Sequence, residues 1–463
     1  MENPLRSAPS WVGNSLLAVG VFAVCWTASV VYWRTSGSTP SGMAIGQLLL
    51  GVPVAILLAL WLGNNLLRAR AAAPAAATPP AAAAGIDSSS QRGPLPGIAA
   101  GAVRLRGGES LEELAESLLS NTAPCELDSE LTDDAGYPVL SGRIESADDL
   151  SVRDVMMPWL ASRGMDDLSF SEEQWRALSL GGAVVAELTE HALLHPRLPD
   201  FLAASPPERA GIALPVLRLR PLLPAGWPGA QRQAAADWYF HLVEQQGWPA
   251  QRLQLANVDT GALSLVDELA ASQGLTLLIA CDSYIGEDSV RDWSERRILF
   301  SGRTPRGQVP GEGAAGLLLA DATQAPLLEF DGVAALHGAG DGQRPLSADA
   351  PGNINVEMLS GLSRHALQES KTEPGAVTAI CADADLRPTR IGELMGVASA
   401  LLPQLDLATQ MMSVGACCGT VGAVGPVAAL ALAGHDALAN GGEVLCLSNS
   451  DSHYRCAVLV RRA

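Results

Sequence analysis

Short strand-like runs alternate with longer stretches of helical periodicity from about Leu105 to the C-terminus, and this alternation limits the folds open to the chain. Strand-like runs occupy residues 214–219, 275–280, 316–319, 333–337, 376–381, 443–447 and 457–460. Apolar residues recur at helical spacing over 110–119, 172–194, 231–246, 357–371, 391–402 and 425–438. The alternation predicts a layered α/β domain with a largely buried sheet.

Composition and charge narrow the choice of partner. Of the 463 residues, 48% are apolar and 17% are charged, and the formal net charge is −19. A protein that binds nucleic acid through its phosphates needs a cationic surface, so this charge argues against a nucleic-acid partner. Acidic acyl carriers would also be steered poorly to such a surface. The eight cysteines are scattered without a CxxC pair, which is typical of reduced, mostly buried thiols, and we expect no cofactor and no metal.

Two uncharged apolar segments near the N-terminus, residues 12–33 and 43–67, are each long enough to cross a hydrocarbon core of about 30 Å. Residues 1–70 are therefore predicted to form a transmembrane hairpin, with a secretory signal or a buried hairpin as the alternatives. The distribution of arginines favours both termini in the cytoplasm, which makes the chain a multi-pass inner-membrane protein. Residues 71–97 are mostly Ala, Pro and Ser and are predicted to be a linker.

A first specific motif covers residues 275–320. It combines a strand that ends at Asp282, the pair Arg296 and Arg297, and a Pro-Gly-Glu-Gly-Ala-Ala turn at 310–315 that leads into the next strand. Because a glycine turn before a strand is common, the turn is informative only together with the preceding strand and the arginine pair.

A second motif covers residues 413–433, where Gly422 and Gly425 precede an alanine-rich helix that can approach its neighbours closely. In this order and spacing, the two motifs resemble those of the β-ketoacyl synthases of the thiolase-like superfamily. The resemblance implies a duplicated α/β/α/β/α layered domain, with an N-terminal half at 98–322 and a C-terminal half at 323–463. It also implies a homodimer, since synthases of this family pair through an edge strand.

The same resemblance implies a set of fold and pocket residues in this chain. They are Asp259, Thr260, Gly261, Asp282, Gly311, Glu312, Gly313, Glu393, Gly422 and Gly425.

The catalytic set of the family is missing at the matching positions. A condensing enzyme needs a cysteine thiolate at a helix N-terminus and two histidines that assist decarboxylation and stabilise the carbanion and the oxyanion. Val258 matches the cysteine, Ala382 and Gly419 match the histidines, and Val414 matches a lysine of the second motif. No cysteine occurs between Cys125 and Cys281, so a small slip of register does not restore the nucleophile.

Two classes of function follow from these residues. The leading hypothesis is a membrane-anchored, non-catalytic adaptor or scaffold that binds a protein partner, such as a secreted effector in a type VI secretion system. The alternative is a condensing enzyme with an unfamiliar residue set, or a chain-length-factor-like subunit that joins a second synthase-like subunit. Asp259, Asp383 and Asp385 are then the best candidate acids, although helix caps and solvated loop carboxylates are their more ordinary roles.

Overall fold

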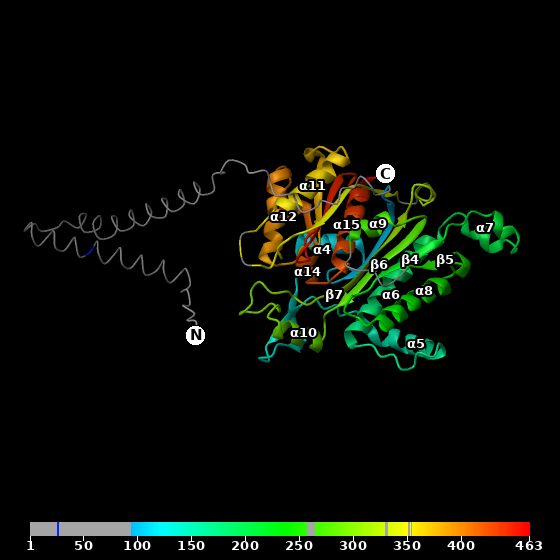
Figure 1. Ribbon diagram of the computed structural model, residues 1–463, viewed down its shortest axis with the longest axis horizontal. Coiled ribbons are helices and arrows are strands. Elements are labelled where there is room, and N and C mark those ends of the chain that lie inside the picture. Colours follow the sequence, from blue (N-terminus) through cyan, green and yellow to red (C-terminus); the bar gives the residue numbers. More distant parts are fainter. Residues whose placement is uncertain (1–25, 27–93, 257–263, 329–331, 351, 353) are drawn as a thin grey trace, which may run out of the picture. The chain divides into compact units, whose positions relative to one another are not determined.

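The computed structural model describes Trp26 and residues 94–463, apart from 257–263, 329–331, 351 and 353 (Figure 1). Except for Trp26, the predicted hairpin at 1–70 lies outside the described residues, and so does nearly all of the predicted linker. Strands and helices alternate along the described chain, so the mixed α/β class predicted from the sequence is confirmed.

The predicted inner-membrane location is corrected here. In the described part of the chain, no helix is both long enough and apolar enough to cross a bilayer. The longest of these helices, α6 (Glu172–Leu193), carries an arginine and four glutamates. The apolar helix α15 (Val424–Asn440) has only 17 residues, whereas a membrane span needs about 20. Both helices pack in the protein interior instead.

The first half of the chain supplies five strands of the large sheet. These are β1 (Gly97–Leu105), β4 (Leu217–Leu222), β5 (Leu253–Leu255), β6 (Leu275–Ser283) and β7 (Glu312–Ala320). They lie in the order β5-β4-β6-β7-β1, in which β5, β4 and β6 are parallel while β7 and β1 are antiparallel to their neighbours. Every residue of β6 and β7 is buried, because helices cover both faces of these strands.

The second half repeats this arrangement. Its strands are β8 (Ala334–Gln343), β9 (Val377–Ala382), β10 (Met411–Ser413), β11 (Glu443–Ser448) and β12 (Tyr454–Arg462), in the order β10-β9-β11-β12-β8. Counted within each half, both orders are third, second, fourth, fifth and first strand, with the same directions. A duplicated layered domain predicts two separate sheets, but β1 and β8 pair at two positions and join the halves into one ten-stranded sheet.

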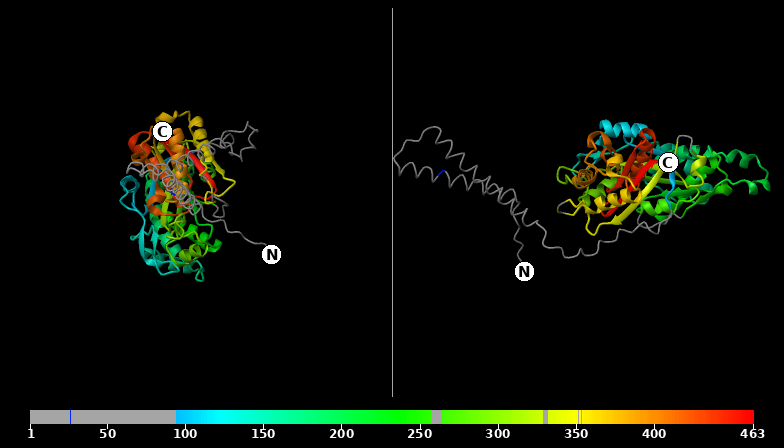
Figure 2. Two further views of the ribbon diagram at one scale, coloured as in Figure 1. Left: turned by 90° about the vertical axis from the view of Figure 1, so that its left-hand side faces the viewer. Right: turned by 90° about the horizontal axis from the view of Figure 1, so that it is seen from above.

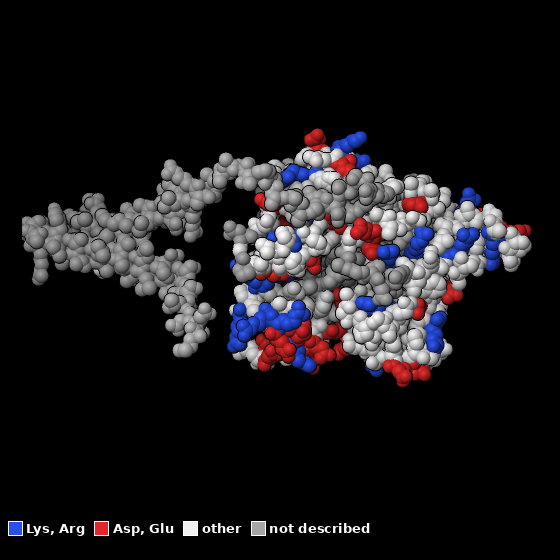
Figure 3. Space-filling model, viewed as in Figure 1, with Lys and Arg blue, Asp and Glu red and all other residues white. Residues whose placement is uncertain are grey.

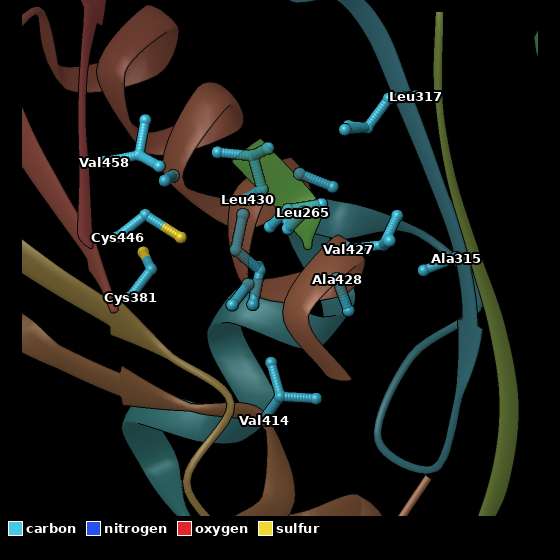
Figure 4. Close-up of a cluster of buried hydrophobic side chains, with 14 of the residues drawn as sticks. Leu265, Ala315, Leu317, Cys381, Val414, Val427, Ala428, Leu430, Cys446 and Val458 are labelled. Carbon is cyan, nitrogen blue, oxygen red and sulfur yellow. The ribbon is translucent and has the colours of Figure 1, made fainter. Parts of the chain in front are cut away.

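Helix α15 forms the central layer between the two halves. Figure 4 shows Val427, Ala428 and Leu430 of α15 between Ala315 and Leu317 of β7 on one side and Cys446 and Val458 of the second half on the other. All of these side chains are buried. The alanine-rich sequence of α15 suits this position, because small side chains let the helix lie close to strands on both sides.

Separate helical layers cover the outer faces of the two halves (Figures 1 and 2). On the first half, α6 lies on β6, β7 and β1, with α5 (Asp149–Ser162) and α8 (Gly229–Gln246) packed against α6. On the second half, α11 (Glu357–Glu369) lies on β8 and β12 and packs against α12 (Pro388–Leu401). Each outer layer has its own cluster of buried side chains.

Smaller elements complete the domain. The helices are α4 (Leu111–Ser120), α7 (Leu198–Ala203), α9 (Leu265–Ala270), α10 (Glu287–Glu295), α13 (Leu407–Gln410) and α14 (Val414–Cys418), and a hairpin is formed by β2 (Glu126–Thr132) and β3 (Pro138–Ser141). On the face drawn in Figure 3, Lys and Arg form patches next to acidic patches and not a continuous band. Helix α10 is one example, since Arg291 and Arg296 pair with Asp288 and Asp292.

Candidate functional site

A cavity of about 570 Å³ opens at the ends of β9 and β11, beside the N-terminus of α15. The carboxyl ends of parallel strands, next to a helix N-terminus, are a common ligand position in α/β proteins. The walls come from the segment after β9, the glycine-rich loop before α15, the β11–β12 turn, and Leu265, Tyr284, Gln308 and Gln343. Asp383, Asp385, Gly419, Gly422 and Gly425, which the sequence singled out separately, all line this cavity.

Asp383 connects the end of β9 to the β11–β12 turn. Its carboxylate accepts hydrogen bonds from the hydroxyls of Ser448 and Ser450, at 2.7 and 2.8 Å, and from the backbone N–H groups of Asn449 and Ser450, at 2.7 and 3.1 Å. The residue is only 2% exposed, which corrects the expectation of a solvated loop carboxylate. Burial raises the pKa of Asp383, although its four donors favour the ionised form.

Asp385 is held by Arg387, and both residues are buried. Nε of Arg387 lies 2.9 Å from each oxygen of the Asp385 carboxylate. The same guanidinium donates to the carbonyl of Ser450 at 2.5 Å and pairs with Asp349 at 3.1 Å. Arg387 therefore fixes the β11–β12 turn from a second direction, and its donors are already engaged.

Glu393 supports this turn from behind. It lies on α12 with its side chain fully buried, and Nε of Arg455 donates to its two oxygens at 3.0 and 2.9 Å. Nδ2 of Asn449 is 3.4 Å from the same carboxylate and also donates to the carbonyl of Arg390 at 3.0 Å. Glu393 does not line the cavity, so its contacts assign it a positioning role for the wall.

The loop before α15 needs glycine at two positions. Gly419 and Gly422 have φ values of 69° and 54°, which side chains rarely tolerate. A Cβ on Gly422 would also lie 2.4 Å from Oδ2 of Asp282. The glycine pattern of the second motif therefore corresponds to a real steric requirement in this loop.

Asp282 brings the first half of the chain to the cavity. It is the last residue but one of β6 and is 4% exposed. It accepts hydrogen bonds from the N–H of Ser283 at 2.9 Å and from the hydroxyl of Tyr284, which lines the cavity. Burial raises the pKa of Asp282 to about 7. The first half thus contributes a titratable group directly beneath the glycine loop.

The Gly311–Gly313 turn lies outside the cavity wall and joins several segments. A Cβ on Gly311 would lie 1.9 Å from the carbonyl oxygen of Cys418, and one on Gly313 would lie 2.3 Å from the side chain of Leu105. Glu312 accepts two hydrogen bonds from Arg176, at 2.6 and 2.8 Å, and one from the N–H of Ile144 at 2.7 Å. These contacts give the turn a role in the fold.

The described part of the cavity offers few groups for condensation chemistry. Ala382 and Val414 are buried apolar residues, and the segment with Val258, Asp259, Thr260 and Gly261 lies outside the described residues. The seven described cysteines are free and buried, as predicted, and none of them lines the cavity. Among the described lining residues, His453 is the one histidine, and its Nδ1 lies 2.9 Å from Oγ of Ser452.

Sequence reasoning did not select His453, Tyr284 or Tyr454 for this wall. Tyr284 lies two residues beyond Asp282, so its role depends on how the end of β6 meets the loop before α15. No spacing of residues within either segment predicts the contact between the end of β6 and this loop.

The fold is that of the ketosynthases, of thiolase-like type. The ketosynthase from module 6 of the bacillaene synthase of Bacillus subtilis 168 aligns with 80% of this chain and 72% of its own length, with a TM-score of 0.53 and 13% identity. An oxazolomycin ketosynthase domain of Streptomyces albus JA3453 aligns over 80% and 76%, with a TM-score of 0.50 and 13% identity. No family model and no curated protein matches the sequence. At these identities, the comparisons establish the fold alone.

Proposed function

We propose that this protein is a non-condensing protein with a ketosynthase fold, and that it binds a small ligand without covalent chemistry in the cavity at β9, β11 and α15. The observation that carries the proposal is the chemistry of the wall. Its strand ends present a carboxylate held by Ser448, Asn449 and Ser450, with no cysteine among the described lining residues.

Condensation requires a nucleophile that accepts the acyl group. Residues 257–263 contain no cysteine in the sequence, and the described cysteines are buried away from the cavity. Burial raises the pKa of Cys281 to about 12, which keeps this thiol protonated and unreactive. These facts support binding over turnover.

The wall is rigid enough to define a binding site. Asp383 and Arg387 hold the β11–β12 turn through side chains that are themselves buried, and Arg455 and Glu393 support it from behind. Sites with preorganised walls lose little conformational entropy when they bind. The volume of about 570 Å³ lies within the usual range for small-molecule pockets.

Covalent acylation is the direct test. The full chain is incubated with an acyl thioester and a malonyl thioester, beside an active ketosynthase, and is examined by intact-mass spectrometry and product assay. We expect no added acyl mass and no condensation product, and the Val258→Cys variant should give no condensation either. An acylated wild-type peptide would reject the proposal in favour of a condensing enzyme.

A second candidate function is a chain-length-factor-like partner of a synthase subunit. It is favoured by β5, which ends the sheet and has no further strand on its outer edge among the described residues. Such an edge can pair with a strand of another chain. Leu255→Pro would remove one backbone donor there, and light scattering should report loss of a dimer if β5 forms the interface. A wild-type chain that stays monomeric at micromolar concentration would reject self-pairing, and one that also fails to form a complex with an added ketosynthase subunit would reject this second candidate.

The adaptor function predicted from the sequence is retained only in its non-catalytic part. No contact among the described residues favours a secreted effector over another protein partner. The proposed ligand site and the edge of β5 are therefore the features to be tested, in place of binding to a secreted effector.

A further inference from the structure

We infer that the cavity selects a ligand with a cationic ammonium head on an apolar body. The inference rests on the proposed binding function and adds to it the chemical class of the ligand.

The charges of the wall are mostly negative. The acidic and basic side chains that line the described cavity are Asp383, Asp385, Asp451, Arg387 and His453. Arg387 is engaged by Asp385, by Asp349 and by the carbonyl of Ser450, so it offers little to an incoming anion. A carboxylate or phosphate ligand would meet repulsion that no uncommitted basic group of the described wall offsets.

Asp451 is the carboxylate best placed to attract a cation. Its Oδ1 accepts the N–H groups of His453 and Tyr454, each at 2.7 Å, and these bonds fix its position. Among the described residues it forms no salt bridge, unlike Asp385. Arg455 lies close enough to lower the pKa of Asp451, but its guanidinium is engaged by Glu393, so an ammonium group in the cavity would be the first cation in direct contact with the Asp451 carboxylate.

The N-terminus of α15 is the feature that would otherwise favour an anion, because helix N-termini carry partial positive charge. Asp383 already lies beside it, since a Cβ on Gly425 in the first turn would be 3.3 Å from Cβ of Asp383. The partial positive charge of this helix N-terminus is therefore already balanced by a carboxylate of the protein itself.

The remaining wall suits a neutral or apolar ligand body. Leu265, Val421 and Pro426 contribute apolar surface. Oγ1 of Thr420 is buried and has no hydrogen-bond partner among the described residues, so it can accept an N–H donor of the ligand. Apolar walls with a few placed polar atoms are the usual composition of a selective pocket.

The test uses three probes with the same chain and different heads: n-octylammonium, 1-octanol and octanoate. Each is titrated calorimetrically into the full-length protein near neutral pH, at low and at high salt. We expect octylammonium to bind at least about threefold more tightly than octanol, octanoate to bind most weakly, and salt to weaken octylammonium alone. Octanoate binding equal to or tighter than octylammonium would overturn the inference while leaving the binding function intact. Absence of binding by all three probes would overturn both.

Two variants, each of which loses one carboxylate charge, show where on the protein the selectivity for octylammonium arises. Asp451→Asn should weaken octylammonium roughly three- to tenfold and leave octanol unchanged. Asp288→Asn removes a carboxylate from the exposed surface of α10 and should change neither probe. Equal binding of octylammonium by the wild type and Asp451→Asn would also overturn the inference.

Discussion

Glu312 and Asp383 are both buried carboxylates, one in each half of the molecule, and both accept hydroxyl and backbone N–H donors, but only Glu312 also has a charged partner. Glu312 receives two hydrogen bonds from the guanidinium of Arg176 and lies in a closed region where α6, β6 and β7 meet. Asp383 receives hydroxyl and backbone N–H donors only, and it faces the cavity. The comparison indicates that the charged pair holds layers together, while the carboxylate with neutral donors shapes a wall.

The largest effect is expected at the charged pair. Arg176→Met leaves the Glu312 carboxylate buried without its cation, and removal of one partner of a buried ion pair costs about 3–5 kcal/mol. Urea denaturation should show this loss as a lower free energy of unfolding. The double variant Arg176→Met, Glu312→Gln removes the stranded charge and should recover a large part of it. Exposed ion pairs contribute up to about 1 kcal/mol. A loss of that size or smaller in Arg176→Met would contradict the structural role of the pair.

The next effect concerns pH and Asp282. Its pKa is about 7 in the folded chain and near 3.8 in the unfolded chain, so between these values the folded state binds more protons. The free energy of unfolding should therefore fall as pH rises from about 4 to about 7, with a full contribution on the order of 4 kcal/mol.

Asp282→Asn should remove that part of the pH dependence, because the amide keeps an oxygen for Tyr284 and cannot titrate. The measurement is urea denaturation of both proteins at pH 5 and pH 7.5, with the exposed Asp288→Asn as the control. Identical pH profiles for the wild type and Asp282→Asn would show that Asp282 does not titrate in this range.

A smaller effect is expected at Asp383. Asp383→Ala leaves buried donors of Ser448, Asn449 and Ser450 without an acceptor, which should cost about 2 kcal/mol. Asp383→Asn should cost about half of that, because hydroxyl groups can rotate to accept from the new amide while an arginine cannot. Equal losses in Asp383→Asn and Asp383→Ala would remove the distinction between Asp383 and the Arg176–Glu312 pair.

Much of the fold followed from local patterns in the sequence. Helical periodicity over 172–194 and 231–246 corresponds to α6 at Glu172–Leu193 and α8 at Gly229–Gln246. Helix α6 buries one side against β6, β7 and β1, and α8 packs mainly against α6, so buried residues recur at helical spacing in both. The junction of β1 and β8 does not follow from the sequence, because pairing between strands far apart in the chain depends on tertiary packing. The hairpin of β2 and β3 does not follow either, because β2 is rich in acidic residues and carries little strand signal.

The candidate site was only partly accessible from the sequence. Gly422 and Asp282 were each selected from motifs about 140 residues apart, but their contact depends on tertiary packing. Asp383 and Asp385 were selected as candidate acids, yet their burial was not foreseen because the donors that satisfy them lie on the β11–β12 turn and on Arg387. The partners of Asp383 come from a distant turn, so its local composition suggests a solvated loop. The partner of Asp385 is local, and its burial follows from tertiary packing.

The smallest effect is expected at Thr420. It tests whether a hydroxyl of the cavity wall stabilises the folded protein or destabilises it. Its Oγ1 is buried without a partner in the described structure, so the hydroxyl costs desolvation and gains no hydrogen bond. Thr420→Val keeps the shape and should leave the free energy of unfolding unchanged or raise it by less than about 1 kcal/mol. Ser448→Ala, which removes a hydroxyl bonded to Asp383, should instead lower it by about 1 kcal/mol. Urea denaturation of the two variants, together with octylammonium titration of Thr420→Val, measures both consequences. If Thr420→Val is as destabilising as Ser448→Ala, the hydroxyl of Thr420 has a structural role in the free protein and is not an acceptor reserved for a ligand.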